Sequence, residues 1–253
     1  MVYIYVLGIM IFFGTRILKI GNHIQYLVAL LRMTVQLAMA GFLLRFIFKL
    51  NTLGVVMLVY FVMSIFASHT VMTRVNAKIK NLFLKLFIPI SISGILSLLF
   101  FQFFLSKTGL WYEARYFIPL SGMFLGNSMN ACAICIDRFV SEIKNNINKI
   151  EVLISLGANP FEAIQKPFRK AIYAASIPII TNMSGIGVVF LPGLMTGQIL
   201  SGADPVVSVK YQISVMVLIL LSLTVASVSV LFFSYKDFFN KEGLLDKQIL
   251  EKK

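Results

Sequence analysis

Residues 209–234 have the sequence Val209-Lys-Tyr-Gln-Ile-Ser-Val-Met-Val-Leu-Ile-Leu-Leu-Ser-Leu-Thr-Val-Ala-Ser-Val-Ser-Val-Leu-Phe-Phe-Ser234, which is apolar apart from short serine and threonine interruptions after Gln212. A helix that crosses the roughly 30 Å hydrocarbon core of a bilayer needs about 20 such residues. The run therefore predicts a membrane-spanning helix. Because similar runs recur along the chain, we expect an all-α fold, a polytopic bundle of membrane helices.

By the same criterion, the chain contains about seven spanning stretches. They are roughly 2–20, 26–48, 53–70, 84–105, 117–137, 171–191 and 209–234. The first stretch is the weakest, because its unbroken apolar part ends at Phe13 and it can cross only if Arg16 and Lys19 snorkel to the interface. About six spans are therefore the alternative to seven. We expect the whole chain, 1–253, to form a single transmembrane domain.

The composition excludes an ordinary water-soluble protein. The chain is 58% hydrophobic and only 13% charged, so it has more apolar surface than one soluble core of this size could hide. A net charge of +13 would suggest nucleic acid as a partner of a soluble protein. Here the basic residues lie in short stretches between apolar runs, a pattern that sets orientation in a bilayer. We therefore expect a lipid bilayer, and no nucleic acid, around this protein.

The distribution of basic residues predicts which side each end occupies. Most of the 23 Lys and Arg residues fall near 16–19, 74–85, 138–170 and 236–253, and the positive-inside rule places these segments in the cytoplasm. The N-terminus is then outside, and a charged tail at about 235–253 is cytoplasmic. No basic segment precedes the first apolar run, so we expect it to be a retained span. The expected location is a plasma membrane, most simply a bacterial inner membrane.

The longest polar stretch between spans, about 137–170, is cytoplasmic in this topology. Gly157 is typical of a helix end, and Asn159 can cap a new helix with Pro160 at its first position. Glu162 follows three residues after Asn159, as in a capping box. The sequence therefore predicts helix, tight turn, helix. Because the second helix has apolar residues at helical spacing, we expect it to lie along the membrane surface.

The fifth span is rich in small and polar residues. Gly122 and Gly126 form a Gly-x-x-x-Gly pair that favours close helix packing. The amides of Asn127 and Asn130 cannot be satisfied by lipid, so they indicate either hydrogen bonds between helices or a transport pathway. The candidate pathway residues are Arg32 and Gln36 in the second span, Met123, Asn127, Met129 and Asn130 in the fifth, and Asn182 in the sixth.

Two cysteines, Cys132 and Cys135, lie three residues apart in the same span. Thiols and thioethers are ligands that soft metals prefer, so these cysteines are weak candidates for a metal site. Methionine, however, is a common packing residue in apolar helices. Whether the cysteines face a pore or lipid stays open at this point.

The sequence offers little for catalysis. It has no Gly-x-x-x-x-Gly-Lys-Ser/Thr loop, so we do not expect the chain to hydrolyse ATP itself. His23 and His69 lack the His-Glu-x-x-His spacing of a zinc hydrolase. We therefore expect no catalytic residues and no cofactor bound by this chain. An intramembrane enzyme acting on lipid or peptide, and a passive channel, are the alternatives from other functional classes.

One segment resembles the cytoplasmic coupling loop of ABC permeases. It is Glu151-Val-Leu-Ile-Ser-Leu-Gly157-Ala-Asn-Pro160, with Glu six residues before Gly-Ala and Pro three residues after that Gly. The match is partial, because Val152 and Leu153 stand where the family has alanines. The residues that the resemblance implicates in coupling to an ATPase are Glu151, Gly157, Ala158, Asn159, Pro160 and Phe161.

A resemblance over nearly the whole chain is to the iron-export ABC permease family, which includes plant aluminium-tolerance permeases. Its motifs are Arg32-Met-Thr-Val-Gln36, Ile118-Pro-Leu-Ser-Gly-Met, Ser155-Leu-Gly-Ala-Asn-Pro160, Leu191-Pro-Gly-Leu-Met-Thr-Gly-Gln198, Gly202-Ala-Asp-Pro205 and Lys210-Tyr-Gln212. The resemblance implies a permease homodimer paired with two cytosolic ATP-binding subunits, which would hold ATP and Mg. The implied activity is export of a metal ion, with iron favoured, or of a nucleotide sugar or other small solute.

Overall fold

The computed structural model describes residues 10, 14, 17, 23–75, 77–105, 112–240 and 242–246. The chain forms two compact units, Met1–Val55 and Val56–Lys253. Over the described residues the regular structure is helical, with two isolated β-bridges. The all-α class predicted from the sequence is therefore confirmed.

The long helix of unit 1 is α2 (His23–Leu50). Its segment Val28–Leu50 is long and apolar enough to cross a membrane, and apolar side chains are exposed along it, as a helix surrounded by lipid requires. The predicted span at 26–48 is confirmed as a helix. The predicted first span at 2–20, apart from residues 10, 14 and 17, lies outside the described residues.

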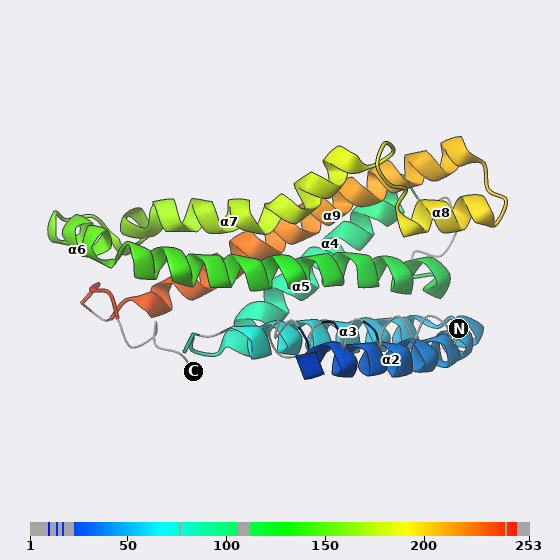
Figure 1. Ribbon diagram of the computed structural model, residues 1–253, viewed down its shortest axis with the longest axis horizontal. Helices are drawn as coiled ribbons and strands as arrows, with labels where there is room; N and C mark the ends of the chain where they lie inside the picture. Colours follow the sequence, from blue (N-terminus) through cyan, green and yellow to red (C-terminus); the bar gives the residue numbers. More distant parts are fainter. Residues whose placement is uncertain are drawn as a thin grey trace. The chain divides into compact units, whose positions relative to one another are not determined.

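The helices of unit 2 pack around α9 (Pro205–Ser234), which contacts α4, α5, α7 and α8. The other elements are α3 (Leu53–Arg74, which begins at the unit boundary), α4 (Leu82–Leu105), α5 (Ala114–Asn145), α6 (Ile147–Ser155), α7 (Pro160–Gly185), α8 (Gly193–Leu200) and the 3-10 helix η1 (Tyr235–Phe238). Figure 1 shows the short helices α6 and α8 at opposite ends of the long helices α7 and α9.

Small residues allow these helices to approach one another closely. A Cβ added to Gly94 of α4 would lie 2.5 Å from the hydroxyl of Tyr60 and 2.9 Å from a methyl group of Leu125. The Tyr60 hydroxyl also donates a 2.6 Å hydrogen bond to the Ser91 carbonyl. Membrane helices, which gain little from the hydrophobic effect among themselves, associate through such close packing and hydrogen bonds.

Buried serines join the three central helices. The hydroxyls of Ser128 in α5 and Ser222 in α9 are 2.8 Å apart, and Ser222 donates to the hydroxyl of Ser93 in α4 over 3.4 Å. All three side chains are fully buried. The bundle therefore has a polar seam in its centre, which satisfies hydroxyl groups that lipid could not.

The number of spans differs from the prediction of about seven. Among the described residues, four helices are long and apolar enough to cross: Val28–Leu50, Leu53–Arg74, Leu82–Phe103 and Pro205–Phe238. The predicted span at 117–137 lies within α5, and residues 171–185 of the predicted span at 171–191 form the second part of α7. In α5 no charged residue occurs from Tyr116 to Ile136, but Asn127, Asn130 and several Ser and Gly residues lower the hydropathy. α7 has charged residues up to Lys170 and ends at Gly185, which leaves too short an apolar stretch.

Two further predictions about α7 were wrong. The helix that was expected to lie separately on the membrane surface is the first part of α7, which continues through Pro167 and Pro178. The sixth span was expected to reach Leu191, but α7 ends at Gly185. The chain turns there, with Gly187 at φ +83° and its amide N–H bonded to the Phe190 carbonyl at 3.0 Å.

Candidate functional site

The turn between α6 and α7 has the geometry that its sequence predicts. Gly157, at φ +93°, donates from its N–H to the Ile154 carbonyl at 2.9 Å, and Ala158 donates to the Leu153 carbonyl at 3.0 Å. This pair of bonds is a Schellman motif, which satisfies the last carbonyl groups of a helix. Glycine is the residue that adopts this left-handed conformation at little cost.

The next residues start α7 with a complete capping box. The Glu162 N–H donates to Asn159 Oδ1 at 2.9 Å, and the Asn159 N–H donates to Glu162 Oε2 at 2.9 Å. Pro160 occupies the first turn, where a missing N–H has no cost. The predicted helix, tight turn, helix is therefore confirmed, and the Schellman bonds and the capping box restrain the turn.

The same turn occurs a second time, at the other end of unit 2. Gly202, also at φ +93°, follows α8 and donates its N–H to the Ile199 carbonyl at 3.0 Å. The Ala203 N–H donates to the Gln198 carbonyl, also at 3.0 Å. Asp204 then caps α9 by accepting from the Val207 N–H at 3.0 Å. The sequence Gly-Ala-Asn/Asp-Pro thus specifies two equivalent corners, one before α7 and one before α9.

Phe161 does not extend into solvent. Its ring packs against the rings of Phe168 at 5.5 Å, Tyr235 at 5.5 Å and Phe232 at 6.5 Å between centroids. The start of α7 is thereby attached to the end of α9. The role of Phe161 in contacting a partner stays a prediction, but its ring already has partners in its own chain.

The exposed apolar side chains of this region lie on α6 instead. Leu156 is 79% exposed, Val152 57% and Leu153 42%, whereas Ile150 is buried against the bundle. In a segment rich in charge, a short helix with an exposed apolar face indicates a contact with another protein. This face could not be deduced from the sequence, because helical spacing does not show which side is covered.

A buried carboxylate holds α7 to α5 close to α6. Glu142 accepts from Lys170 Nζ at 2.9 Å and pairs with Arg138 at 2.6 Å, and its side chain is only 6% exposed. The hydrogen bond from Lys170 holds the pKa of the Glu142 carboxyl below its usual value, against the opposing effect of burial, and the charge of Arg138 acts in the same direction.

The candidate pathway residues are only partly together. Met123, Asn127 and Asn130 lie on one side of α5, spaced by four and three residues; Asn130 is exposed, and Asn127 donates from Nδ2 to the Met123 carbonyl at 2.7 Å. The half-buried Met129 lies on a different side of α5, and the exposed Asn182 lies near the end of α7. Arg32 and Gln36 are exposed on α2 in unit 1.

The two cysteines face the interior of the bundle. Cys132 and Cys135 are both fully buried, and Cys135 Sγ lies 3.9 Å from the Ser227 carbonyl of α9. In the described part of the chain, no group of three or more His, Cys, Asp and Glu side chains could hold a metal ion. Both thiols thus lie inside the bundle, and a metal-binding role for them stays a prediction.

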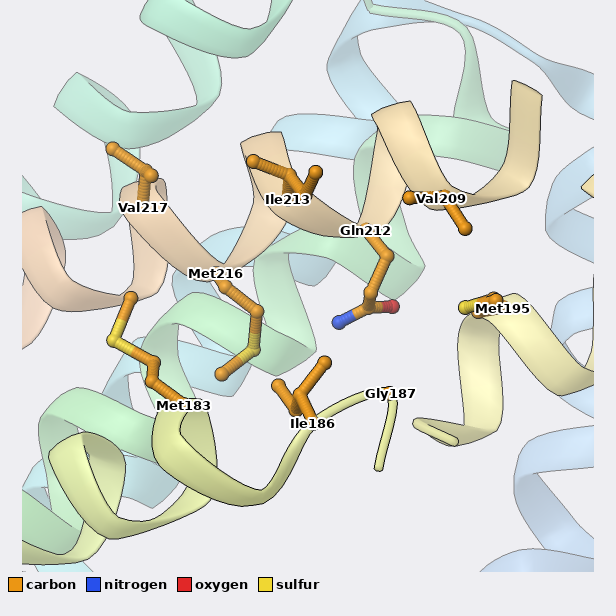
Figure 2. A pocket seen from close by; sticks show the side chains of 9 residues that line it. All are labelled: Met183, Ile186, Gly187, Met195, Val209, Gln212, Ile213, Met216 and Val217. Atoms are coloured by element: carbon orange, nitrogen blue, oxygen red, sulfur yellow. The ribbon is translucent and has the colours of Figure 1, made fainter. Parts of the chain in front are cut away.

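A pocket of about 370 Å³ lies between the end of α7, α8 and the first half of α9. Three methionines from three helices line it: Met183, Met195 and Met216. Figure 2 shows the Gln212 side chain pointing into the space, with Met195 on one side and Met183 and Met216 on the other. Gln212 is 3% exposed, and its Oε1 has no hydrogen-bond partner in the described structure.

An unpaired buried oxygen costs about 1–3 kcal/mol, so the pocket is a place where a ligand would improve stability. Hydropathy and residue spacing did not predict this pocket. Its signal was present in the motifs Leu191–Gln198 and Lys210–Gln212, which contain Met195 and Gln212. What the motifs could not show is that α7 contributes a third methionine, Met183.

A family model for an uncharacterised protein family, UPF0014, matches residues 1–239. The chain belongs to the UPF0014 family. The match includes both Gly-Ala-Asn/Asp-Pro corners, the α6 face and every residue that lines the methionine pocket.

Relatives of this chain agree with the predicted resemblance. "UPF0014 membrane protein slr1647" of Synechocystis is 37% identical over 85% of this chain and 83% of its own length. "Protein ALUMINUM SENSITIVE 3" of Arabidopsis thaliana is 29% identical over 86% and 78%. "Probable iron export permease protein FetB" of Escherichia coli is 28% identical over 88% and 84%. No solved structure matches the chain. The chain is therefore a multi-pass membrane protein, similar to a protein named as a probable permease.

Proposed function

We propose that this chain is the membrane-spanning permease subunit of an ABC-type exporter, driven by ATP that a separate cytosolic subunit hydrolyses. The observation that carries the proposal is the element formed by α6, the Gly157 corner and the start of α7. It combines an exposed apolar helix face with a turn that a Schellman motif and a capping box hold. A partner that binds the face could move the connected helices without first unfolding the turn.

Leu156, with Val152 and Leu153, is the surface that we assign to the ATP-binding subunit. Short amphipathic helices commonly bind by placing apolar side chains in a partner's groove. Phe161 has a different part in this mechanism: its ring ties the moving corner to the end of α9. We therefore place the contact on α6 and the bracing function on Phe161.

The connections of α6 suggest how a displacement reaches the membrane. α5 precedes α6 directly and α7 follows the corner, while the Glu142–Lys170 bond joins these two long helices. A push on α6 would thus tilt α5 and α7 together, as rigid bodies. With the basic segments in the cytoplasm, α6 faces the ATP-binding subunit and the α8 corner faces outside.

The uncovered side of α5 is the surface that we assign to a second permease copy and the pathway between the two copies. Asn130 and Asp137 are exposed there, and Gly126 has no heavy atom within 4 Å of an added Cβ among the described residues. Amide and carboxylate groups at membrane depth face other protein or water rather than lipid. Two permeases and two ATP-binding subunits would then form the transporter.

The exported solute is, in our proposal, a metal ion. Iron is the first candidate because the 28% identical relative FetB is named a probable iron export permease. A nucleotide sugar is the second candidate for the transport assay. Transport of either solute is measured as its ATP-dependent accumulation in inverted vesicles that contain the complex.

The proposal is tested with two matched variants. Leu156→Asp should abolish copurification with a co-expressed ATP-binding subunit and stop ATP-dependent transport. Leu200→Asp is the control, since Leu200 is 83% exposed, ends the short helix α8 and precedes the equivalent corner at the opposite end. It should leave the complex intact. Loss of the complex in both variants, or in neither, would overturn the assignment of α6.

A further inference from the structure

The methionine pocket is built differently from a packed core. Methionines in a core fill space, but Met183, Met195 and Met216 border an open volume of about 370 Å³. They come from the consecutive helices α7, α8 and α9, so each of three elements contributes one thioether. The arrangement is a lined cavity and not a stripe along a single helix.

Gln212 is a second, independent sign of a ligand. Its side chain is 3% exposed, its Oε1 has no hydrogen-bond partner in the described structure, and Figure 2 shows its amide directed into the pocket. Buried polar groups are normally paired. A bound cation or hydrogen-bond donor would supply the missing partner.

The chemistry of the lining selects among cations. Thioether sulfur is a soft, neutral ligand that favours monovalent copper and its analogue silver, whereas carboxylates favour harder ions. No charged side chain is among the described residues that line the pocket. A divalent ion would keep its full charge uncompensated in this apolar space, which costs more than burial of a monovalent ion. The lining therefore disfavours a hydrated divalent metal.

From these observations we infer that Met183, Met195, Met216 and the carbonyl oxygen of Gln212 form a binding site for a soft monovalent metal ion of the Cu(I) class. The export of this ion rests on the proposed function, whereas its binding in the pocket does not. Under that function the site lies at the end of unit 2 opposite α6, where an exported ion would leave. It names a metal class different from the iron of the relative's name.

Binding is measured on the purified full-length permease without any ATP-binding subunit, in chloride-free detergent buffer. The probe is Ag(I), which has the ligand preferences of Cu(I) without its redox chemistry, and titration calorimetry gives affinity and stoichiometry. We expect one Ag(I) per chain. Because thioethers do not lose a proton on binding, the affinity should be the same at about pH 5.5 and about pH 8.

Near-isosteric variants identify the ligands. Replacing methionine by leucine keeps size and apolarity, so Met183→Leu, Met195→Leu and Met216→Leu should each weaken Ag(I) binding at least about tenfold, and the triple variant should lose it. Gln212→Leu should weaken it about tenfold. Met72→Leu, on α3 outside the pocket, is the control and should bind as the unmodified chain does. Circular dichroism checks that each variant keeps its helical content.

The inference is overturned if the unmodified permease does not bind Ag(I), or if the triple variant binds it equally well. It is also overturned if Fe(II) binds in this pocket and Ag(I) does not displace it. A separate assay follows ATP-dependent Ag(I) transport by the complex with its ATP-binding subunit. Methionine-dependent binding without transport of any solute would refute the proposed function and leave the metal site in place.

Discussion

Lys170 Nζ lies 2.9 Å from Glu142 Oε2, and this bond joins the first part of α7 to the last part of α5. The carboxylate is buried while both of its cationic partners are about half exposed. Only the carboxylate of this pair is buried. Removal of Glu142 therefore leaves two cations that water can still solvate. Because α5 and α7 flank α6, the contact lies on the route by which a displacement of α6 would spread.

Glu142→Gln should lower the free energy of unfolding by about 1 kcal/mol, because an amide of the same shape keeps a weaker hydrogen bond but loses the charge attraction. It should also reduce transport more than ATP hydrolysis in a reconstituted complex. Thermal unfolding and paired rate measurements check this. Lys166→Gln, which replaces an exposed lysine one helical turn before Lys170, is the comparison and should change neither quantity.

Acid should weaken the same contact. The pKa of Glu142 is lowered in the folded state from its ordinary value of 4.5, so the folded state binds fewer protons than the unfolded state in this range. The contribution of Glu142 to stability is therefore complete above about pH 4.5 and is lost as the pH falls through the lower folded-state pKa. Thermal unfolding between pH 7 and pH 3 should show a smaller acid loss in Glu142→Gln than in the unmodified chain. Identical acid profiles would contradict this assignment.

Gly94→Ala should destabilise the bundle by about 1–3 kcal/mol, because the added methyl group overlaps the Tyr60 hydroxyl and the Leu125 side chain. Gly197→Ala, on α8, is the matched control, since a Cβ there has no heavy atom within 4 Å. The control should be neutral or slightly stabilising, because alanine is the better helix former. Unfolding of the purified permease by heat would separate the two variants, and equal midpoints would show that Gly94 is not closely packed.

Phe161→Ala should lower stability by about 2 kcal/mol, since a half-buried ring loses its contacts with Phe168 and Tyr235. Phe161→Leu should lose less. Neither substitution should prevent copurification with an ATP-binding subunit if Leu156 supplies the contact. If Phe161→Ala released the subunit and left thermal stability unchanged, the ring and not α6 would be the partner's contact.

Local rules account for the parts of the structure that the sequence predicted well. The Gly157 corner follows from capping chemistry that involves only neighbouring residues, so Asn159 and Glu162 could be assigned directly. The helices α3, α4 and α9 follow from hydropathy over one continuous segment. In each case the information needed lies within about 20 residues.

The remaining features depend on contacts between distant segments. Periodicity shows that Phe161 lies on an apolar face, but not that the end of α9 covers it. Likewise, periodicity does not show that Cys132 and Cys135 face the interior of the bundle. The methionine pocket requires three helices to meet. The continuity of α7 through Pro167 could not be read from propensity, because packing against α5 and α9 stabilises a helix that proline alone would interrupt.

The two Gly-Ala-Asn/Asp-Pro corners restrict motion between the helices of the C-terminal half of the molecule. Each corner locks the angle between a short helix and a long one, so neither can serve as a hinge without breaking several hydrogen bonds. Between Ile147 and Ser234 the remaining break in the helices is Ile186–Pro192. Backbone hydrogen bonds hold this turn too, among them Gly187 N–H to the Phe190 carbonyl and Val189 N–H to the Gly185 carbonyl. A stroke that begins at α6 would therefore reach the methionine pocket, which this turn borders, through the whole length of α7.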